Sequence, residues 1–218
     1  MIDLYVDLET VPCQDPAYRA ELRKGIKAPA QYKKPDSIAA WMAENAEDAT
    51  DEALAKTSFD PAAGHICTIG FALGDEPAES FHATTVQGEK WAIEQFYDRL
   101  PKLGMVRVIG HYISGFDLRF LLCRSIILGV PIPPCIPRDV KPWSEFVFDT
   151  MTAWAGAKGS ISQDRLAKAL GLAGKGDFDG SMVAAAWAAG EHDKIAAYCR
   201  DDVETVRAIH KRFEAVNF

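Results

Sequence analysis

Two acidic side chains, Asp7 and Glu9, stand one residue apart near the end of the opening apolar stretch, MIDLYVDLETV. Apolar residues fill the even positions from 2 to 8, which is the period of a β-strand. Both acids therefore point to the same side of that strand. Neighbouring carboxylates repel one another and resist burial. A divalent cation such as Mg²⁺, which takes oxygen ligands, removes this conflict; alternatively, the strand ends here and water solvates both acids.

A third acid, Asp202, interrupts the apolar face of a long helix expected over residues 191–216. At about 100° per residue, Asp202 falls in the middle of one stripe, whereas Asp201 points toward the polar side. The stripe consists of Ile195, Tyr198, Cys199, Val206, Ile209 and Phe213. An acid on a buried helix face is costly unless a partner compensates it. A metal ion, an arginine or a hydrogen bond to Tyr198 would each serve.

A fourth acid, Asp117, opens a helix in the sequence GFDLRFLL, where the surrounding positions are apolar. The helix dipole favours an acid in the first turn, so a purely structural role is the simplest interpretation of Asp117 alone.

These acids need a scaffold, and the chain predicts a mixed α/β one. Strands are expected at residues 2–8, 65–75, 78–84, 105–111 and 145–150, with a hairpin turn at 74–77. Helices are expected at 89–100, 116–129, 161–172, 181–190 and 191–216. The segment at about 12–64 fits this alternation poorly. We interpret it as an insertion between the first two strands, with one helix at 37–46.

Composition limits the class of protein. The 218 residues are 48% hydrophobic, enough for the core of one large domain over residues 1–218. A net charge of −7 argues against a protein that coats nucleic acid by bulk charge. The five cysteines form no C-x-x-C pair, which favours free thiols in a reducing cytoplasm. No signal peptide and no membrane-spanning helix is expected.

Three separated motifs appear in a recognisable order: D-x-E on the first strand, F-D at a helix start, and Y-x-x-x-D on the last helix. This pattern resembles the DEDD superfamily of 3′–5′ exonucleases, in the tyrosine branch. That branch has a tyrosine four residues before the last aspartate, and Tyr198 is there. The histidine branch has its histidine five residues before, where this chain has Ala197. Over nearly its whole length the chain is most similar to stand-alone relatives of the proofreading domain of family-B DNA polymerases.

The resemblance implies an RNase H-like α/β fold, with a mixed five-stranded central sheet flanked by helices. It implies hydrolysis of single-stranded DNA from the 3′ end to nucleoside 5′-monophosphates, in DNA replication or repair. Two Mg²⁺ or Mn²⁺ ions per active site are expected. The metal ligands would be Asp7, Glu9, Asp117 and Asp202, and these acids together with Tyr198 form the expected catalytic set. The expected partner is a single-stranded DNA 3′ end, with recruitment by a replication or repair protein as a further hypothesis.

Four further residues are candidates for substrate binding by the same resemblance. Thr10 lies where relatives meet the terminal 3′-hydroxyl, and Phe116 would wedge near the terminal base or pack beneath the site. Tyr112 stands where the family usually has Asn; it would stack on a base or pack under its loop. Lys175, like the basic stretch from Arg19 to Lys34, would contact phosphates upstream, although such residues are commonly just solvated charges.

Two other functions remain open at this stage. An exoribonuclease of the RNase D kind has the same four acids and tyrosine. A non-catalytic module could also keep a nuclease fold to recruit a replication protein, but such a module has no use for the acidic cluster.

Overall fold

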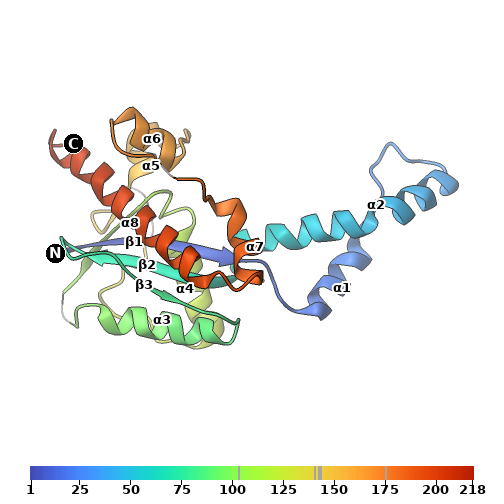
Figure 1. Cartoon of the computed structure of the whole chain (residues 1–218), viewed down its shortest axis with the longest axis horizontal. Coiled ribbons are helices and arrows are strands. Elements are labelled where there is room, and N and C mark those ends of the chain that lie inside the picture. The colour runs from blue at the N-terminus through green and yellow to red at the C-terminus, as the bar shows by residue number, and fades with distance from the viewer. Residues whose placement is uncertain (103, 140, 142–143, 175) are drawn as a thin grey trace.

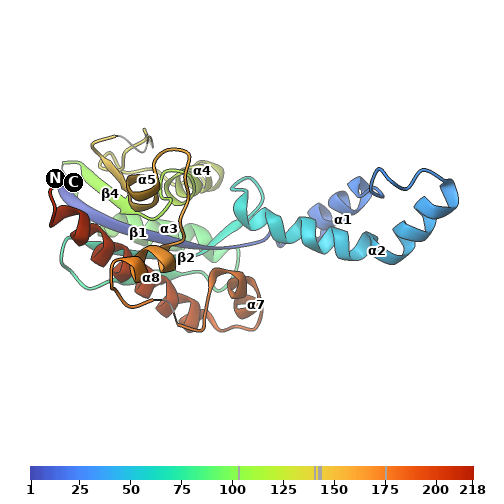
Figure 2. The same ribbon diagram turned by 90° about the horizontal axis from the view of Figure 1, so that it is seen from above.

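A mixed five-stranded sheet forms the centre of the computed structural model, which describes residues 1–102, 104–139, 141, 144–174 and 176–218 (Figures 1 and 2). The strands are β1 (Ile2–Val11), β2 (His65–Leu73), β3 (Glu79–His82), β4 (Val106–Gly110) and β5 (Val147–Asp149). Their order is β3-β2-β1-β4-β5. The pairs β1–β2 and β2–β3 are antiparallel, whereas β1–β4 and β4–β5 are parallel. The expected mixed sheet is therefore confirmed.

Helices cover both faces of this sheet. The longer ones after β2 are α3 (Gly88–Arg99), α4 (Asp117–Leu128) and α8 (His192–Glu214). The shorter ones are α5 (Thr150–Ala155), α6 (Gln163–Ala169), the 3₁₀ turn η2 (Gly180–Met182) and α7 (Val183–Ala188). Helices α3 and α4 pack on one face and α8 crosses the other (Figure 1). Within the described residues, no helix is both long enough and apolar enough to cross a bilayer.

The alternation along β1 divides its side chains between the two faces as the sequence predicts. Leu4, Val6 and Leu8 lie in the core beneath α3 and α4. Tyr5 lies on the opposite face and packs against Val203 and other residues of α8. Asp7 and Glu9 follow the odd-numbered set, so they lie on the α8 side at the carboxyl end of β1.

A helical arm projects from that same end of β1 (Figures 1 and 2). It consists of α1 (Pro16–Gly25), α2 (Pro35–Ala55) and the segment between them, and the 3₁₀ turn η1 (Lys56–Phe59) leads back into β2. No side chain of α1 is buried. Arg19 pairs with Glu47 and Asp51 at 3.0 and 2.8 Å, and Arg23 pairs with Glu47 at 2.7 Å. The helix expected at 37–46 is thus longer than predicted, and α1 was not predicted.

Local signals in the sequence begin and end several helices. Ser162 accepts a hydrogen bond from the backbone N–H of Arg165 at the start of α6. Asp149 caps α5 in the same way, with its carboxylate accepting from Met151 and Thr152. Gly129, at φ 65°, ends α4 in the left-handed conformation that glycine adopts without strain.

A buried ion pair joins the elements beneath the sheet. The Glu89 carboxylate, at the start of α3, accepts two hydrogen bonds of 2.7 Å from Arg124 of α4. It also accepts from the backbone N–H of Ile66 in β2 at 2.9 Å. Burial alone would raise the pKa of Glu89, but the hydrogen bonds from His65, Arg124 and Ile66 outweigh it and hold that pKa below its usual value. Glu89 therefore fixes α3, α4 and β2 relative to one another.

We predict that Glu89→Gln lowers the free energy of unfolding by about 3–5 kcal/mol, because Arg124 stays buried without its counter-charge. Chemical denaturation measures this loss. The double variant Glu89→Gln/Arg124→Met should lose less than the sum of the two single variants, since it removes both charges. Additive losses would show that the pair does not couple these elements.

The same carboxylate gives the stability a pH dependence of known sign. A lowered pKa in the folded state means that the stabilisation is present above the unfolded value, 4.5, and is lost as pH falls through the folded value. The wild-type protein should lose this part of its stability below about pH 4.5, whereas Glu89→Gln should not.

Candidate active site

A close contact between α8 and β2 sets the geometry of the acidic cluster. A Cβ atom on Gly70 would lie 2.8 Å from Sγ and 2.9 Å from the carbonyl oxygen of Cys199, so only glycine admits α8 this close. Gly70 is paired with Asp7 across the β1–β2 ladder. As a result, the Cys199 thiol donates to the backbone oxygen and to Oδ2 of Asp7, at 3.4 Å each.

Asp7, Glu9 and Cys199 offer ligand atoms that lie within 4.8 Å of one another. Burial, followed by the negative charges of Asp7 and Glu9, raises the pKa of the Cys199 thiol well above the ordinary value, which favours the protonated form that donates a hydrogen bond. Asp7 and Glu9 offer carboxylate oxygens, the type of ligand that Mg²⁺ and Mn²⁺ prefer.

Asp117 joins this cluster from the other side of the sheet. Its carboxylate is 5% exposed and accepts a 3.0 Å hydrogen bond from the backbone N–H of Leu8, between Asp7 and Glu9. Burial raises the pKa of Asp117 to about 7, and the negative charges of Asp149 and Asp202 act in the same direction. A role limited to the helix dipole does not explain this position, because a buried carboxylate beside other acids is disfavoured unless a cation is near.

Asp202 and Tyr198 complete the cluster from α8. Asp202 is 4% exposed, and the Nε2 group of Gln163 donates to its Oδ1 and to its backbone oxygen, at 3.1 Å each. Burial raises the pKa of the Tyr198 phenol, and the charges of Asp202 and Glu9 and a hydrogen bond with Asp202 raise it further. The structure thus brings together the four predicted acids and the predicted tyrosine.

The Tyr112 ring lies against its own loop but stays half exposed. The backbone of Tyr112 is left-handed, with φ 60°, which is uncommon for a residue other than glycine. The backbone N–H donates to Asp149 at 3.1 Å, and the ring covers Gly115, whose Cβ would lie 2.2 Å from the ring. About half of the side chain, 49%, remains exposed. The buried Asp149 therefore holds Tyr112 in a conformation that presents its ring to solvent.

Thr10 and Phe116 lie beside η1. The Thr10 hydroxyl donates to the backbone oxygen of Ser58 at 2.7 Å. The Phe116 ring is partly buried between Phe120 and Phe59, with ring centroids 5.3 and 6.1 Å apart. Lys175, the fourth candidate for substrate binding, lies outside the described residues.

Two residues at the site were missed by sequence reasoning. Gln163 lies in a helix that was expected, but its contact with Asp202 spans 39 residues of sequence and has no local signal. Phe59 is 73% exposed beside Phe116. Phe59 lies in the segment that we interpreted as an insertion. That segment has no regular apolar pattern around Phe59 from which its position could be inferred.

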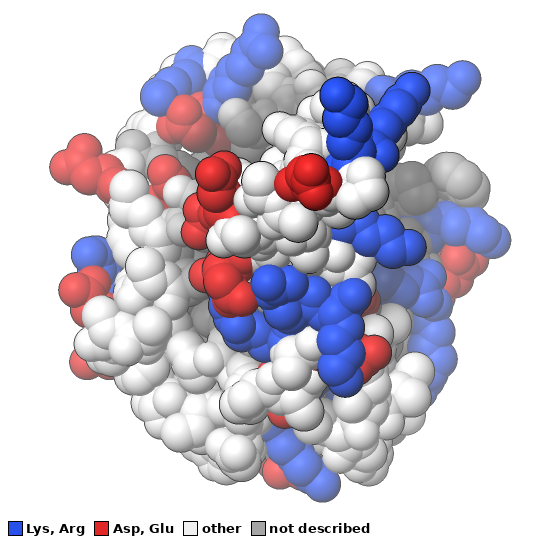
Figure 3. Space-filling model, turned by 90° about the vertical axis from the view of Figure 1, so that its right-hand side faces the viewer, with Lys and Arg blue, Asp and Glu red and all other residues white. Residues whose placement is uncertain are grey.

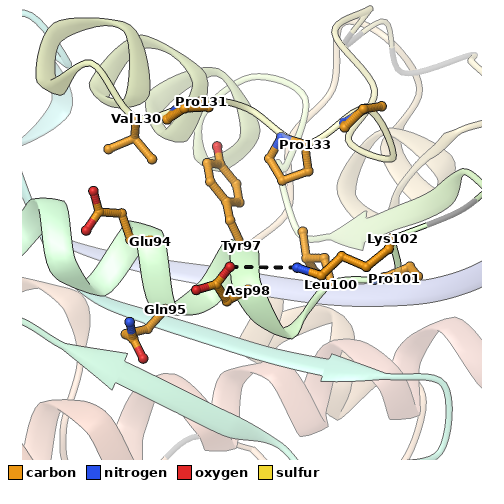
Figure 4. A pocket seen from close by; sticks show the side chains of 11 residues that line it. Glu94, Gln95, Tyr97, Asp98, Leu100, Pro101, Lys102, Val130, Pro131 and Pro133 are labelled. Carbon is orange, nitrogen blue, oxygen red and sulfur yellow. Dashed lines mark ion pairs between the residues drawn. The ribbon is translucent and has the colours of Figure 1, made fainter.

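A second acidic group and a hollow beside α3, both in the described part of the chain, differ from this cluster. Asp3, His210 and Glu214 also lie within metal-ligand distance of one another. However, Arg107 already donates two hydrogen bonds of 2.8 Å to Asp3, so a cation is in place. A hollow between α3 and the proline-rich segment after α4 is lined by Tyr97, Pro131 and an Asp98–Lys102 ion pair (Figure 4). It contains none of the clustered acids.

Comparison with known protein families identifies a match for most of the chain. The family model described as a predicted 3′–5′ exonuclease related to the exonuclease domain of PolB matches residues 65–217. That range includes Asp117, Tyr198 and Asp202 but not Asp7 or Glu9 on β1. No curated protein sequence matches the chain.

Among solved structures, the family B DNA polymerase from the hyperthermophilic archaeon Pyrobaculum calidifontis is similar to this chain, with a TM-score of 0.58. The two share 16% sequence identity, and the match covers 98% of this chain and 24% of the polymerase. At this identity the likeness establishes the fold, which is the RNase H-like fold of a PolB exonuclease. The expected fold class is confirmed.

We predict that Gly70→Ala lowers the free energy of unfolding by about 1–3 kcal/mol, because the added methyl group forces α8 away from β2. Urea denaturation measures the loss. Gly180→Ala is the matched control, since a Cβ there meets nothing within 4 Å. Equal stability of the two variants would contradict the close contact at Gly70.

Proposed function

The chain belongs to the family of predicted 3′–5′ exonucleases related to the exonuclease domain of PolB, and we propose that it is a divalent-metal-dependent 3′–5′ exonuclease of the DEDD tyrosine branch. Its proposed substrate is a single-stranded DNA 3′ end, and its products are nucleoside 5′-monophosphates. One observation carries the proposal: β1, α4 and α8 bring Asp7, Glu9, Asp117, Tyr198 and Asp202 into one cluster.

The carboxylates suit a pair of divalent cations. Asp7 and Glu9 would hold them from β1, Asp202 from α8 and Asp117 from α4. When bound, such a pair activates water for attack at phosphorus and stabilises the charge that develops on the leaving 3′ oxygen. The buried Asp117 supports this assignment, because a nearby cation would favour its charged form and so lower a pKa of about 7.

Tyr198 positions the reacting groups and does not remove a proton. Its raised pKa keeps the phenol protonated at neutral pH, so it acts as a hydrogen-bond donor. The hydroxyl stands one turn before Asp202 on the same helix face. It can therefore donate to the attacking water or to an oxygen of the scissile phosphate.

The substrate side of the site has an apolar and a polar part. Phe116 and the half-exposed Tyr112 offer ring faces to the terminal bases, and stacking on them does not depend on sequence. The Thr10 hydroxyl oxygen, which already donates to Ser58, can accept a hydrogen bond from the terminal 3′-hydroxyl. We also propose that Lys175 contacts a phosphate upstream of the cleaved end.

The wider setting of this chemistry is part of the proposal. We propose one nuclease domain over residues 1–218, acting in the cytoplasm in DNA replication or repair, with recruitment by a protein of that machinery. An exoribonuclease would use the same cluster, so RNA is tested beside DNA. A non-catalytic module would degrade neither.

We predict that Asp202→Ala lowers the rate by roughly a thousandfold or more, because the stabilisation that the metal ions supply amounts to several kcal/mol. The measurement is a ladder assay with Mg²⁺ or Mn²⁺ on DNA and RNA oligonucleotides labelled at the 5′ end. Asp201→Ala is the control: Asp201 precedes Asp202 but is exposed, so its loss should leave the rate near that of wild type. Equal loss in both variants, or no metal-dependent ladder from the wild type, would refute the proposed site.

Tyr198→Phe isolates the phenol hydroxyl. We predict a 10- to 100-fold lower kcat, because one hydrogen bond to a charged group is worth about 1.5–3 kcal/mol. The Mn²⁺ affinity, measured by calorimetry, should stay within about twofold because Tyr198 supplies no carboxylate. A large loss of Mn²⁺ affinity would instead make Tyr198 part of the structure of the metal site.

A further inference from the structure

We propose that the tip of the helical arm, residues 23–34, is a second contact site for the nucleic-acid strand, where lysines bind phosphates upstream of the end being cleaved. The inference rests on the proposed function and extends it from the catalytic cluster to a distant part of the same substrate.

The tip of the arm carries an excess of positive charge. Every charged residue from 23 to 34 is basic, and the members are Arg23, Lys24, Lys27, Lys33 and Lys34. Within α2, Glu47 and Asp51 pair with Arg19 and Arg23, and Asp36 stands in the first turn, next to the tip. In a chain of net charge −7, a run of basic residues without acids favours a polyanion at this place.

Lys27, Lys33 and Lys34 are exposed, and in the described part of the chain no carboxylate lies within ion-pair distance of them. The ion pairs between α1 and α2 therefore involve Arg19 and Arg23, and the ammonium groups of these three lysines can bind phosphate. Figure 3 faces the side on which the arm projects, and Lys and Arg side chains gather near the centre of this face.

The tip is ordered against α2. The backbone N–H of Tyr32 donates to the oxygen of Pro29 at 3.0 Å, closing a turn. The Tyr32 ring lies against Trp41 of α2, with centroids 6.3 Å apart. The lysines next to Tyr32 are thus presented from a fixed turn, which lowers the entropy lost when they bind phosphate.

The arm also has a suitable position and length. It leaves β1 directly after the acids, and η1 returns beside Thr10, so its base stands at the edge of the proposed active site. The 21 residues of α2 span about 30 Å along the helix axis. That distance corresponds to about nine nucleotides of a stacked strand, at 3.4 Å each. A strand with its 3′ end at the acids can reach the tip only if it is several nucleotides long.

The test uses two charge-matched variants. Lys27→Gln/Lys33→Gln/Lys34→Gln removes three charges from the tip. The control, Lys102→Gln/Lys211→Gln/Arg212→Gln, removes three exposed charges after α3 and near the end of α8, at the opposite end of the sheet (Figure 1). The ratio of kcat/KM on an oligonucleotide of about 20 nucleotides to that on one of about four is measured for each, from 50 to 200 mM salt.

For a single strand, neutralising three phosphates makes affinity fall about 20-fold over this salt range. The wild-type and control ratios should therefore fall steeply with salt, and the tip variant should lose most of this dependence. Equal ratios in the tip and control variants, while the wild type degrades both oligonucleotides, would overturn the arm site and leave the proposed function standing. If the wild type degrades neither, the proposed function fails and this inference fails with it.

Discussion

Repulsion between buried carboxylates is the main physical constraint on the acidic cluster. Asp117 and Asp202 are almost fully buried, and the charge of Asp202 helps to raise the pKa of Asp117. Asp7 and Glu9 act in the same way on Tyr198 and Cys199. A fold gains no stability from gathering like charges in a site of low dielectric. The cations that we propose would balance this charge.

Preorganisation depends on contacts that lie outside the cluster. The absence of a side chain at Gly70 lets α8 approach β2, which brings Cys199 against Asp7 and Asp202 near Asp117. Leu8 positions Asp117 through its backbone N–H, and Gln163 does the same for Asp202. Asp117 thus accepts from a backbone N–H and Asp202 from a side-chain amide. Both contacts orient a carboxylate in the cluster.

The sequence predicted the parts of this site that leave a local pattern. The alternation along β1 placed Asp7 and Glu9 on one face, and the apolar stripe of α8 placed Asp202 among buried residues; both expectations hold. The helix start at Asp117 and the caps Ser162 and Asp149 were equally local. Two tertiary contacts could not be predicted from the sequence. The Gln163–Asp202 contact and the approach of α8 to Gly70 join residues that are far apart in the chain.

The helices of the arm were harder to predict from the sequence than the residues of the site. Asp15 caps α1, proline opens both α1 and α2, and these start signals were present in the sequence. Neither helix has a broad buried face, and only one helix, at 37–46 within α2, was expected in this segment. An element without a buried face is held by few contacts, and here exposed ion pairs between α1 and α2 are among them. Such an element is better explained by what it can bind than by what it packs against.

The most direct test of the central claim is anomalous diffraction from crystals soaked with Mn²⁺, which locates the ion without reference to activity. We expect Mn²⁺ density among Asp7, Glu9, Asp117 and Asp202, and none at Asp3, His210 and Glu214, where Arg107 already supplies the charge. Mn²⁺ bound at the second group, or no Mn²⁺ among the first four acids, would contradict the account.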